Sequence, residues 1–458
     1  MGKSITKSLR NRVILAGSWT MFVYVASQIL RLVGNIVLTR LLVPEMFGIM
    51  ALASVILMGL NLFTDVGLLQ NVVQSRRGDD LRFLNVVWVV QIARGALLSI
   101  ITFLLSWLLL IAGEEGWLPI SSAYSNPVLP AVVAAFALIP LISGFNSSKL
   151  MVANRKLNLG KVAVLELISQ IFGLIIMIVW AWHERTIWAL VGGNIATTLL
   201  KMILSHTNLD GAANRFEWDQ SIFYEIFHFG KWIFISSILG FLSTQGDKLL
   251  LGGMISAEKM GIYSIAFFLA NAGRDALMKL SGTVFYPALS EVVRDNPEKL
   301  SEVYYKIRRH IDAFTFFFSG FLIMTGSTIV KFLYDERYID AGWMLQILSI
   351  SLASVGFLTA GQVCMALGHV EVISILAGIR VLVLYISIPL LFLIYGMQGA
   401  VWAIAISPIF IMVGYMWFLK KFNVFKLQKE FIMFPMLIIG ITTGLIVNYI
   451  FNTFVIIK

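Results

Sequence analysis

Long apolar stretches, separated by short polar ones, run along almost the whole chain. Thirteen of them approach or exceed the ~20 apolar residues that a helix needs to cross a bilayer. They cover approximately residues 13–42, 46–72, 85–112, 128–150, 158–182, 186–205, 232–253, 262–284, 311–333, 342–366, 371–395, 398–420 and 431–457. The pattern predicts an all-α polytopic membrane protein with 13 spans. The first stretch is too long for a signal-peptide core and has no small-residue cleavage site, so we expect a retained helix.

Composition supports the membrane class. Of the 458 residues, 59% are hydrophobic and 13% charged, and the mean hydropathy is +0.86. A soluble domain usually carries about 25% charged residues. The net charge of +10 indicates basic cytoplasmic loops rather than nucleic-acid binding. Cys364 is the only cysteine, which excludes an internal disulfide or a cysteine-based metal cluster.

The distribution of Lys and Arg predicts the orientation. With the N-terminus inside, 24 of the 35 basic residues fall at the inner side and 7 at the outer side. The remaining four lie within spans, and they are all arginines: Arg31, Arg94, Arg274 and Arg380. Because Lys and Arg accumulate in cytoplasmic loops, we expect a cytoplasmic N-terminus. The regular alternation also supports the count of 13 spans, since one missed helix would scramble it.

An internal repeat predicts two halves. Shifted by 213 residues, the segment 17–53 aligns without a gap over 230–266, with seven identities in 37 positions. The identities include a Glu-x-x-Gly turn, at Glu45 and Gly48 in the first copy and at Glu258 and Gly261 in the second. Six spans separate the copies, so both keep the same orientation. We therefore expect two lobes related by an axis along the membrane normal, as in parallel-repeat transporters.

The repeat and the loops together predict four regions. An N-terminal six-helix lobe covers 1–206, and a C-terminal six-helix lobe covers 232–420. Between them, 207–231 is expected to be a cytoplasmic amphipathic linker that lies along the membrane interface, because Ile222 and several Phe side chains share one helical side. Residues 421–458 form an extra transmembrane helix, either an accessory span or the remainder of a pair from which a fourteenth is missing.

Arg31 is the most informative residue of the first span. A charge at the centre of a membrane helix costs roughly 2.5–3.5 kcal/mol on insertion scales. Residues three, four and seven positions apart share a helix face, and the face of Arg31 also carries Gln28 and Asn35. Such a polar stripe must face protein or water rather than lipid. We expect it to line a cavity shared by the two lobes.

Other spans contribute further polar residues to the predicted cavity. The candidate substrate-binding residues are Arg31, Arg274, Arg94, Arg380, Gln28, Asn35 and Asn271. The candidate acids, for ion coupling or structural charge pairs, are Asp65, Glu166, Asp247 and Asp275. Structural pairing and substrate contact both remain open for each residue, whereas the set as a whole favours a water-filled binding site. Arg carries a bidentate fork that matches phosphate, so four arginines indicate a phosphate-bearing ligand.

The motifs of enzymes are missing from the sequence. The five His lie at span ends or in loops, no metal-ligand spacing occurs, and no Gly-rich phosphate loop or Walker motif is present. We therefore predict no catalytic residue, no metal and no cofactor. Transport would be driven by an ion gradient or by downhill flux of the substrate.

Several segments resemble a known family. "LLVPEMFGIMALA" followed by "DVGLLQNVVQ", and later "DKLLLGGMISAEKMGIYSIA" and "VFYPALSEVVRDNPEKL", resemble bacterial polysaccharide flippases of the Wzx type, in the multidrug/oligosaccharidyl-lipid/polysaccharide exporter superfamily. The resemblance implies two six-helix lobes and alternating access. It also implies that undecaprenyl-pyrophosphate-linked repeat units move from the inner to the outer leaflet. In related lipid-linked-sugar flippases cationic cavity residues contact the pyrophosphate, and Arg on the first and eighth helices is typical, so the resemblance points to Arg31 and Arg274. The odd span count departs from the family's usual twelve or fourteen.

The resemblance also sets the expected context and the alternatives. It implies a monomer in the bacterial inner membrane that serves lipopolysaccharide or exopolysaccharide synthesis beside a polymerase machinery, with membrane lipids and no nucleic acid as partners. One alternative is a drug/cation antiporter of the same superfamily, whose site would favour acids and aromatics over four arginines. A membrane glycan polymerase or acyltransferase would require a sizeable outside loop or a membrane-facing His/Asp site.

Overall fold

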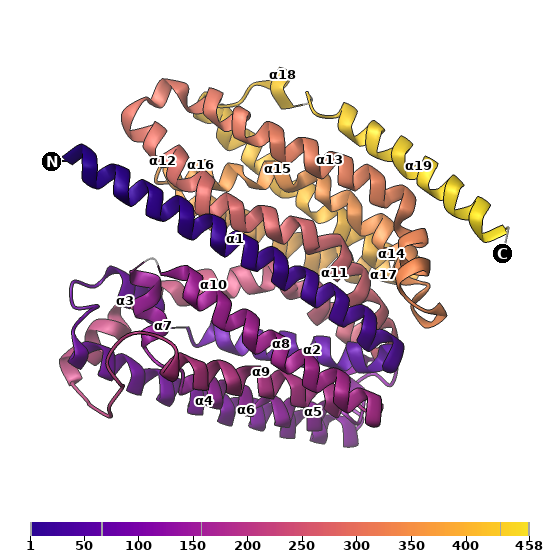
Figure 1. Cartoon of the computed structure of the whole chain (residues 1–458). Helices are drawn as coiled ribbons and strands as arrows, with labels where there is room; N and C mark the ends of the chain where they lie inside the picture. Colours follow the sequence, from indigo (N-terminus) through magenta and orange to yellow (C-terminus); the bar gives the residue numbers. More distant parts are fainter. Residues whose placement is uncertain (1, 66, 157, 431, 457–458) are drawn as a thin grey trace. The chain divides into compact units, whose positions relative to one another are not determined.

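The computed structural model is a bundle of helices (Figure 1). It describes the chain except for residues 1, 66, 157, 431 and 457–458, and except for the side chains of 2–21, 228–236, 276, 279–280, 283–284 and 454–456. No β-strand occurs within that described part. Nine of its helices are long and apolar enough to cross a membrane, and a tenth is added if one bent pair counts as a single span. The predicted class, an all-α multi-pass membrane protein, is therefore confirmed.

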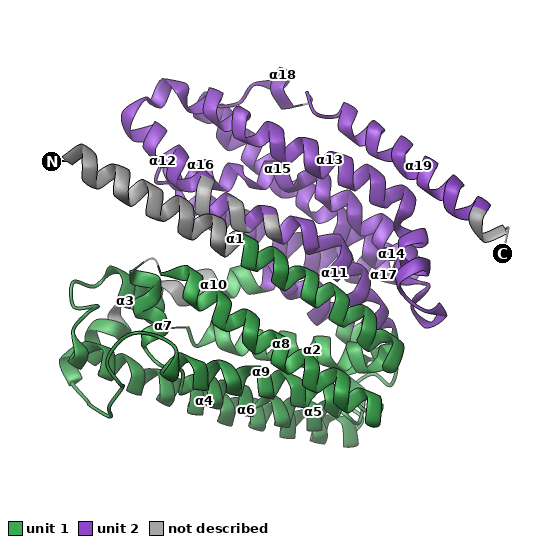
Figure 2. Ribbon diagram, viewed as in Figure 1, with its two compact units in different colours: residues 1–241, 252–258 green, residues 242–251, 259–458 purple. Residues whose placement is uncertain are grey.

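The chain forms two compact units (Figure 2). Unit 1 comprises residues 1–241 and 252–258, and unit 2 comprises 242–251 and 259–458. One long helix contributes residues to both units, and the division into lobes at 1–206 and 232–420 stays a prediction.

The described part of unit 1 contains nine helices and, of a tenth, all residues except 242–251, which belong to unit 2. They are α1 (Gly2–Leu41), α2 (Pro44–Phe63), α3 (Leu68–Gln74), α4 (Leu81–Glu114), α5 (Leu129–Phe136), α6 (Leu138–Gly144), α7 (Lys149–Arg155), α8 (Leu159–His183), α9 (Trp188–Thr207) and α10 (Gln220–Met254). Helix α8 packs against both α1 and α9, and α4 packs against α5 and α6.

Unit 2 contains the remaining helices. They are α11 (Ala257–Leu280), α12 (Tyr286–Asp295), α13 (Leu300–Leu333), α14 (Ala341–Leu348), α15 (Val355–Leu358), α16 (Ala360–Ala366), α17 (Val370–Lys421), α18 (Leu427–Glu430) and α19 (Pro435–Ile456). The long helix α13 lies at the centre of the packing, since α12, α14, α15 and α19 all contact it.

Several predicted spans are broken helices in the structure. The range 46–72 divides into α2 and α3, and 128–150 divides into α5, α6 and α7, with a bend of 64° before α7. The range 342–366 consists of α14, a 3₁₀ segment, α15 and α16. The apolar pattern did not predict these breaks, because it reports the length of a crossing and not the continuity of its hydrogen bonds.

Helix α17 shows the opposite case. It covers two predicted spans, 371–395 and 398–420, that meet at Gly396. Gly396 has φ of 60°, a left-handed conformation that favours glycine, and it interrupts the helical geometry between the two halves. The sequence therefore placed this boundary correctly.

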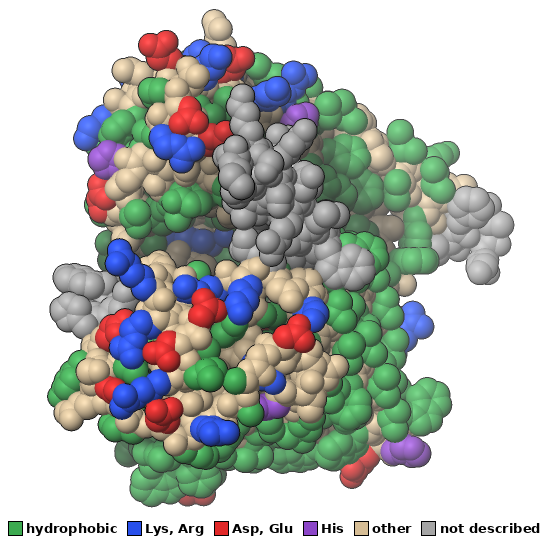
Figure 3. Space-filling view, turned by 60° about the vertical axis from the view of Figure 1, so that its left-hand side comes forward, with side chains coloured by type: hydrophobic (Ala, Val, Ile, Leu, Met, Phe, Trp, Pro, Cys, Tyr) green, Lys and Arg blue, Asp and Glu red, His purple; other side chains and the backbone are tan. Residues whose placement is uncertain are grey.

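Contacts between loops support the predicted alternation of the spans. In unit 1, Arg155 pairs with Asp79 at 3.1 Å and Arg82 pairs with Asp219 at 3.0 Å. These pairs join three connections that were all predicted to lie inside. At the opposite end of the helices, Asn126 donates to Glu45 at 2.6 Å, which joins two connections predicted to lie outside. Figure 3 shows charged side chains gathered at the end that comes forward in that view, with hydrophobic side chains along the flank.

The segment 207–231 has a different form from the expected linker. Residues 208–219 form no helix or strand, and from Gln220 onward the chain belongs to α10, which continues to Met254. Ile222 and Ile226 are buried against α3 and α4 rather than turned toward lipid. The hydroxyl of Ser221 and the N–H of Ile222 donate to Asp219 just before this helix, which lowers the pKa of the Asp219 carboxyl.

The helix ends agree with the predicted repeat. Helix α1 ends at Leu41 and α2 begins at Pro44, while α10 ends at Met254 and α11 begins at Ala257. Both boundaries recur 213 residues later, at the offset where the sequences align. The aligned identities that lie outside the described side chains are Gly17 with Gly230 and Trp19 with Trp232. The relation of the complete lobes to one another stays a prediction.

Helix α19, which covers the last of the predicted spans, packs against α13 within unit 2. A methyl group at Gly440 of α19 would overlap the carbonyl oxygen of Phe317, and one at Gly320 of α13 would overlap that of Leu437. Asn448 of α19 also donates to the carbonyl of Met324 at 2.7 Å. Small residues at the contact let the two helix backbones approach closely, as is typical of membrane helix pairs.

Candidate functional site

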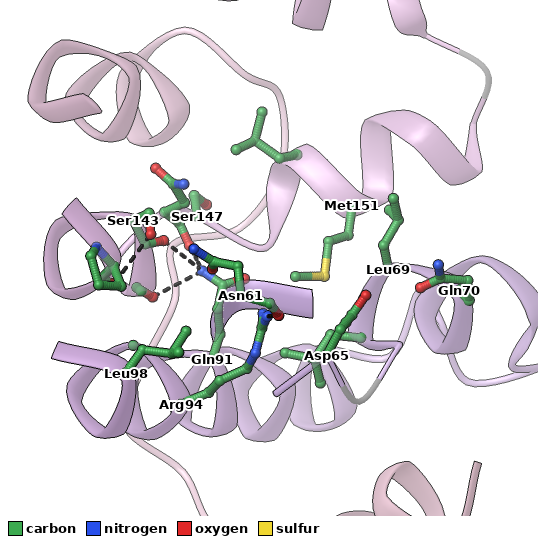
Figure 4. Close-up of a pocket in the computed structure, with 16 residues that line it drawn as sticks. Asn61, Asp65, Leu69, Gln70, Gln91, Arg94, Leu98, Ser143, Ser147 and Met151 are labelled. Carbon is green, nitrogen blue, oxygen red and sulfur yellow. Dashed lines mark hydrogen bonds between the residues drawn. The ribbon is translucent and has the colours of Figure 1, made fainter. Parts of the chain in front are cut away.

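A polar cavity of about 320 Å³ lies inside unit 1 (Figure 4). Its walls come from α2, α3, α4, α6 and α7. The polar side chains that line it are Asn61, Asp65, Gln70, Gln91, Arg94, Ser143, Asn146 and Ser147. A cavity of this size with a few convergent polar groups has the character of a small-molecule site.

Gln91 and Arg94 of α4 hold the walls of this cavity together. Gln91 donates to the carbonyls of Gly144 and Asn146, both at 2.9 Å, and so ties α4 to the turn between α6 and α7 (Figure 4). The guanidinium of Arg94 donates to the carbonyls of Asn61, at 2.6 Å, and Thr64, at 2.8 Å. Arg94 therefore satisfies the last carbonyls of α2, which have no partner within the helix.

Asp65 lies directly beyond this helix end. Its carboxylate accepts the N–H of Gly67 at 2.9 Å, which shapes the turn into α3, and it lies close enough to Arg94 to interact with that charge. Two of the candidate site residues are thus brought together in unit 1, and both have structural partners.

Arg31 is in a different situation. It lies midway along the apolar stretch Phe22–Leu41 of α1, and its side chain is exposed on the surface of the protein chain. Among the described residues, no acid pairs with Arg31 and no carbonyl accepts from it. A cation at this depth without a protein partner requires water or an anionic ligand.

The helix face that carries Arg31 also includes Ser27 and Gly34, and its residues lie in two different environments. Ser27 donates to Gln170 of α8 at 2.5 Å, and Gly34 lies against Leu174 of the same helix. This part of the stripe is a contact between helices, contrary to the expectation that the whole stripe lines a cavity. Gln28 and Asn35 remain partly exposed beside Arg31.

A second cluster forms inside unit 2, where three helices meet. Asp247 of α10 is buried, and the hydroxyl of Tyr263 of α11 donates to one of its carboxylate oxygens. The other oxygen has no hydrogen-bond partner among the described residues. Tyr385 of α17 packs closely on Gly246, which holds α17 against α10 at this level.

The two arginines of this unit belong to the same cluster. Arg274 of α11 donates to Asn271 at 3.1 Å and lies near Asp247 and Asp275. Arg380 of α17 lies close enough to both Arg274 and Asp247 for the charges to interact. The Nε of Arg380 has no hydrogen-bond partner in the described part of the chain. The structure thus brings together five predicted residues, and the outermost two, Asp247 and Arg380, lie more than a hundred residues apart in the sequence.

Glu166 has a separate, local partner. Its carboxylate pairs with Lys201 of α9 at 2.6 Å, and both side chains are partly exposed. The two helices that carry this pair, α8 and α9, pack along their length, so the pair joins neighbours in sequence and space.

Sequence reasoning missed one group of buried charges. Arg308 of α13 lies 3.0 Å from Asp312 and 2.6 Å from Glu430 of α18, and each of the three residues is 4% exposed or less. The four-residue spacing of Arg308 and Asp312 on one helix could have indicated the first pair. Nothing in the sequence indicated Glu430. In the described residues no group of three or more His, Cys, Asp or Glu side chains could hold a metal ion.

The fold is that of a known class of membrane transport proteins. The chain has a TM-score of 0.69 to the lipid II flippase MurJ in an inward closed conformation, with 15% identity over 96% of this chain and 98% of that one. It has the same TM-score to an inward-facing multidrug resistance MATE transporter of the MOP superfamily, with 14% identity over 88% of this chain and 98% of that one.

Sequence comparison gives the family. Residues 37–343 match the family described as polysaccharide biosynthesis protein, and the chain belongs to this family. It is 23% identical over 373 residues to the lipopolysaccharide biosynthesis protein WzxC of Escherichia coli, covering 80% of this chain and 72% of WzxC. It is 24% identical over 281 residues to the amylovoran biosynthesis protein AmsL of Erwinia amylovora, covering 60% of this chain and 70% of AmsL.

Proposed function

We propose that the protein is a flippase for lipid-linked oligosaccharides. It moves polysaccharide repeat units, carried on undecaprenyl pyrophosphate, from the inner to the outer leaflet by alternating access. Membership of the polysaccharide biosynthesis family and similarity to WzxC support the pathway, and the MurJ-like fold supports the kind of transport. The protein is then a transporter and not an enzyme.

The observation that carries the proposal is the state of Arg31. A guanidinium halfway along an apolar helix, with no acid or carbonyl partner among the described residues, is costly unless a ligand neutralises it. A pyrophosphate is such a ligand, because its oxygens accept two parallel N–H bonds from one Arg. An organic cation would be repelled, which disfavours the drug/cation antiporter although MATE transporters share the fold.

The candidate residues have different roles in this proposal. Arg31 and Arg274 contact the pyrophosphate, and Gln28, Asn35 and Asn271 provide polar contacts beside them. Arg380 adds positive charge next to Arg274. The acids Asp247 and Asp275 balance this charge, and one oxygen of Asp247, which has no hydrogen-bond partner among the described residues, could bind a coupling cation or proton. Arg94 serves mainly to hold the end of α2.

The proposed orientation rests on the distribution of the basic residues. The N-terminus is cytoplasmic, because 24 basic residues then lie on the inner side and 7 on the outer side. The lobes 1–206 and 232–420 move relative to one another, and the thirteenth span accompanies the second lobe. The protein acts as a monomer in the inner membrane and delivers repeat units to a polysaccharide polymerase.

The decisive experiment measures glycan display in cells that lack their native flippase. Arg31→Ala and Arg274→Ala should each reduce display roughly ten- to a hundredfold at unchanged membrane abundance, since a charge-assisted hydrogen bond contributes about 1.5–3 kcal/mol. Lys at either position should restore it in part. Arg185→Ala, at an outer loop, is the matched control. Full display by both Ala variants at normal abundance would refute the binding-site assignment.

A further inference from the structure

A second cavity lies in unit 2, and none of the residues assigned to substrate lines it. It has a volume of about 440 Å³ and is enclosed by the first turns of α13 and by the segment that joins α18 to α19. The residues that line it are Glu302, Tyr305, Lys306, Arg309, His310, Asp312, Lys429, Ile432 and Met433.

Three cations dominate the lining of this cavity. Lys306 and Arg309 come from α13, and Lys429 comes from α18. None of the three forms an ion pair with a described acid. Of the two acids in the lining, Asp312 is engaged with Arg308, and Glu302 lies one helical turn before Lys306. The cavity therefore has an excess of positive charge.

Apolar side chains also line this cavity. Ile432 and Met433 line the cavity, and Phe434 follows them at the start of the apolar helix α19. Ile432 and Phe434 are about half exposed, at 51% and 47%. Cations and apolar side chains thus line the same cavity, close in sequence to the start of an apolar helix long enough to span a membrane.

The positions of these walls are set by buried contacts. Glu430 accepts from the hydroxyl of Tyr305 and pairs with Arg308, so the residue next to Lys429 is fixed to α13. The N–H of Lys426 also donates to the Tyr305 hydroxyl, at 2.9 Å. Lys429 is consequently held opposite Lys306 and Arg309 before any ligand arrives, which lowers the entropic cost of binding.

We propose that this cavity binds the phosphate headgroup of an anionic phospholipid of the surrounding leaflet. Lys306, Arg309 and Lys429 bind the phosphate, and Ile432 and Met433 contact the first part of the acyl chains. Basic pockets between membrane helices on the cytoplasmic side bind lipid headgroups of this kind. The lipid is a resident ligand that holds α13 against the segment before α19, and it is distinct from the lipid that is transported.

The test uses the purified full-length protein in a neutral detergent. Binding of phosphatidylglycerol is measured by native mass spectrometry and by the shift in melting temperature, against phosphatidylcholine and inorganic phosphate. Phosphatidylglycerol should bind and stabilise, and the other two should not. The triple variant Lys306→Gln, Arg309→Gln, Lys429→Gln should bind phosphatidylglycerol about a hundredfold more weakly, because each Lys or Arg near an anionic lipid contributes about 1 kcal/mol.

Two further variants make the test specific to this cavity. Glu302→Gln removes the repelling carboxylate and should tighten binding. A matched variant, Lys331→Gln, Lys420→Gln, Lys421→Gln, removes three exposed cations elsewhere in the same unit and should bind as the unchanged protein does.

Three outcomes would overturn the proposal. Equal losses in the two triple variants would show that the attraction is not local. Inorganic phosphate binding as tightly as phosphatidylglycerol would identify a soluble anion as the ligand. Loss of glycan display in the cavity variant, with phosphatidylglycerol binding unchanged, would assign the cavity to the transported lipid. Failure of the Arg31 and Arg274 experiment affects none of these readings, so the two proposals are tested separately.

Discussion

Glu430 pairs with Arg308 across 2.6 Å, which joins the short helix before the last span to the base of α13. Asp312 lies on the other side of the same guanidinium at 3.0 Å, so one buried cation is shared by two buried carboxylates. The aromatic ring of Phe357 covers the guanidinium, with 3.9 Å between Cζ and the ring centre. The cluster has two carboxylates and one guanidinium, so it carries one negative charge in excess. Replacing the cation should therefore affect stability more than replacing either acid.

The first prediction concerns the loss of stability on replacing each of these three residues. Arg308→Gln leaves two buried carboxylates without a cation and should lower the free energy of unfolding by at least about 3–5 kcal/mol. Glu430→Gln and Asp312→Asn each leave a balanced pair and should cost much less. Unfolding in detergent, followed by circular dichroism, measures the order. Equal losses in all three variants would show that the charge balance does not govern this cluster.

The second prediction separates two roles of Arg94. If Arg94 caps α2, Arg94→Gln leaves the carbonyls of Asn61 and Thr64 unsatisfied and should destabilise the protein by about 1–3 kcal/mol. Membrane abundance and transport should then fall together. The exposed Arg77→Gln is the control. Normal membrane abundance combined with loss of transport would instead indicate that Arg94 contacts the substrate.

The third prediction concerns the packing of the thirteenth span. Gly440→Ala should destabilise unit 2, by about 1–3 kcal/mol for overpacking, although Ala is the better helix former, because its methyl group meets the backbone of α13. Gly378→Ala on α17 meets open space and should be neutral or slightly stabilising. Melting temperatures of the two variants give the comparison. A stable Gly440→Ala variant would mean that α19 is not held closely against α13.

The fourth prediction tests the orientation of the chain. On a Cys364→Ala background, single cysteines replace Ser4, Ser121 and Lys426, and intact cells are treated with an impermeant thiol reagent. Ser121 lies exposed in the longest predicted outside loop and should be the position that labels. The other two should react only after the membrane is opened. Labelling at Ser4 or Lys426, but not at Ser121, would reverse the orientation.

The family resemblance was also visible in the sequence, and its motifs lie at definite places in the fold. "LLVPEMFGIMALA" forms the turn from α1 into α2, and "DKLLLGGMISAEKMGIYSIA" forms the turn from α10 into α11. Both turns are short, and each begins its second helix at the same point of the repeat. Motifs of this kind can be recognised in a sequence because a tight turn between two apolar helices restricts the residues that can form it.

The sequence by itself determined the class of this protein, an all-α multi-pass membrane protein, and the apolar stretches from which its long helices form. The physical reason is that lipid requires a minimum apolar length for every crossing and excludes unpaired backbone groups. Each span must therefore be encoded by one contiguous apolar stretch of the sequence. The same constraint singled out Arg31, Arg94, Arg274 and Arg380, since a charge inside an apolar run is conspicuous wherever the run lies.

Only the tertiary structure decided what each of those charges meets. The sequence singles out Arg31 and Arg94 alike as charges within apolar stretches. The packing places Arg94 against the carbonyls at the end of α2, whereas Arg31 has no partner among the described residues. It also joins Arg308 to Glu430, a contact between elements far apart in the chain. A face is a local property of one helix, whereas its neighbour depends on how all the helices pack together.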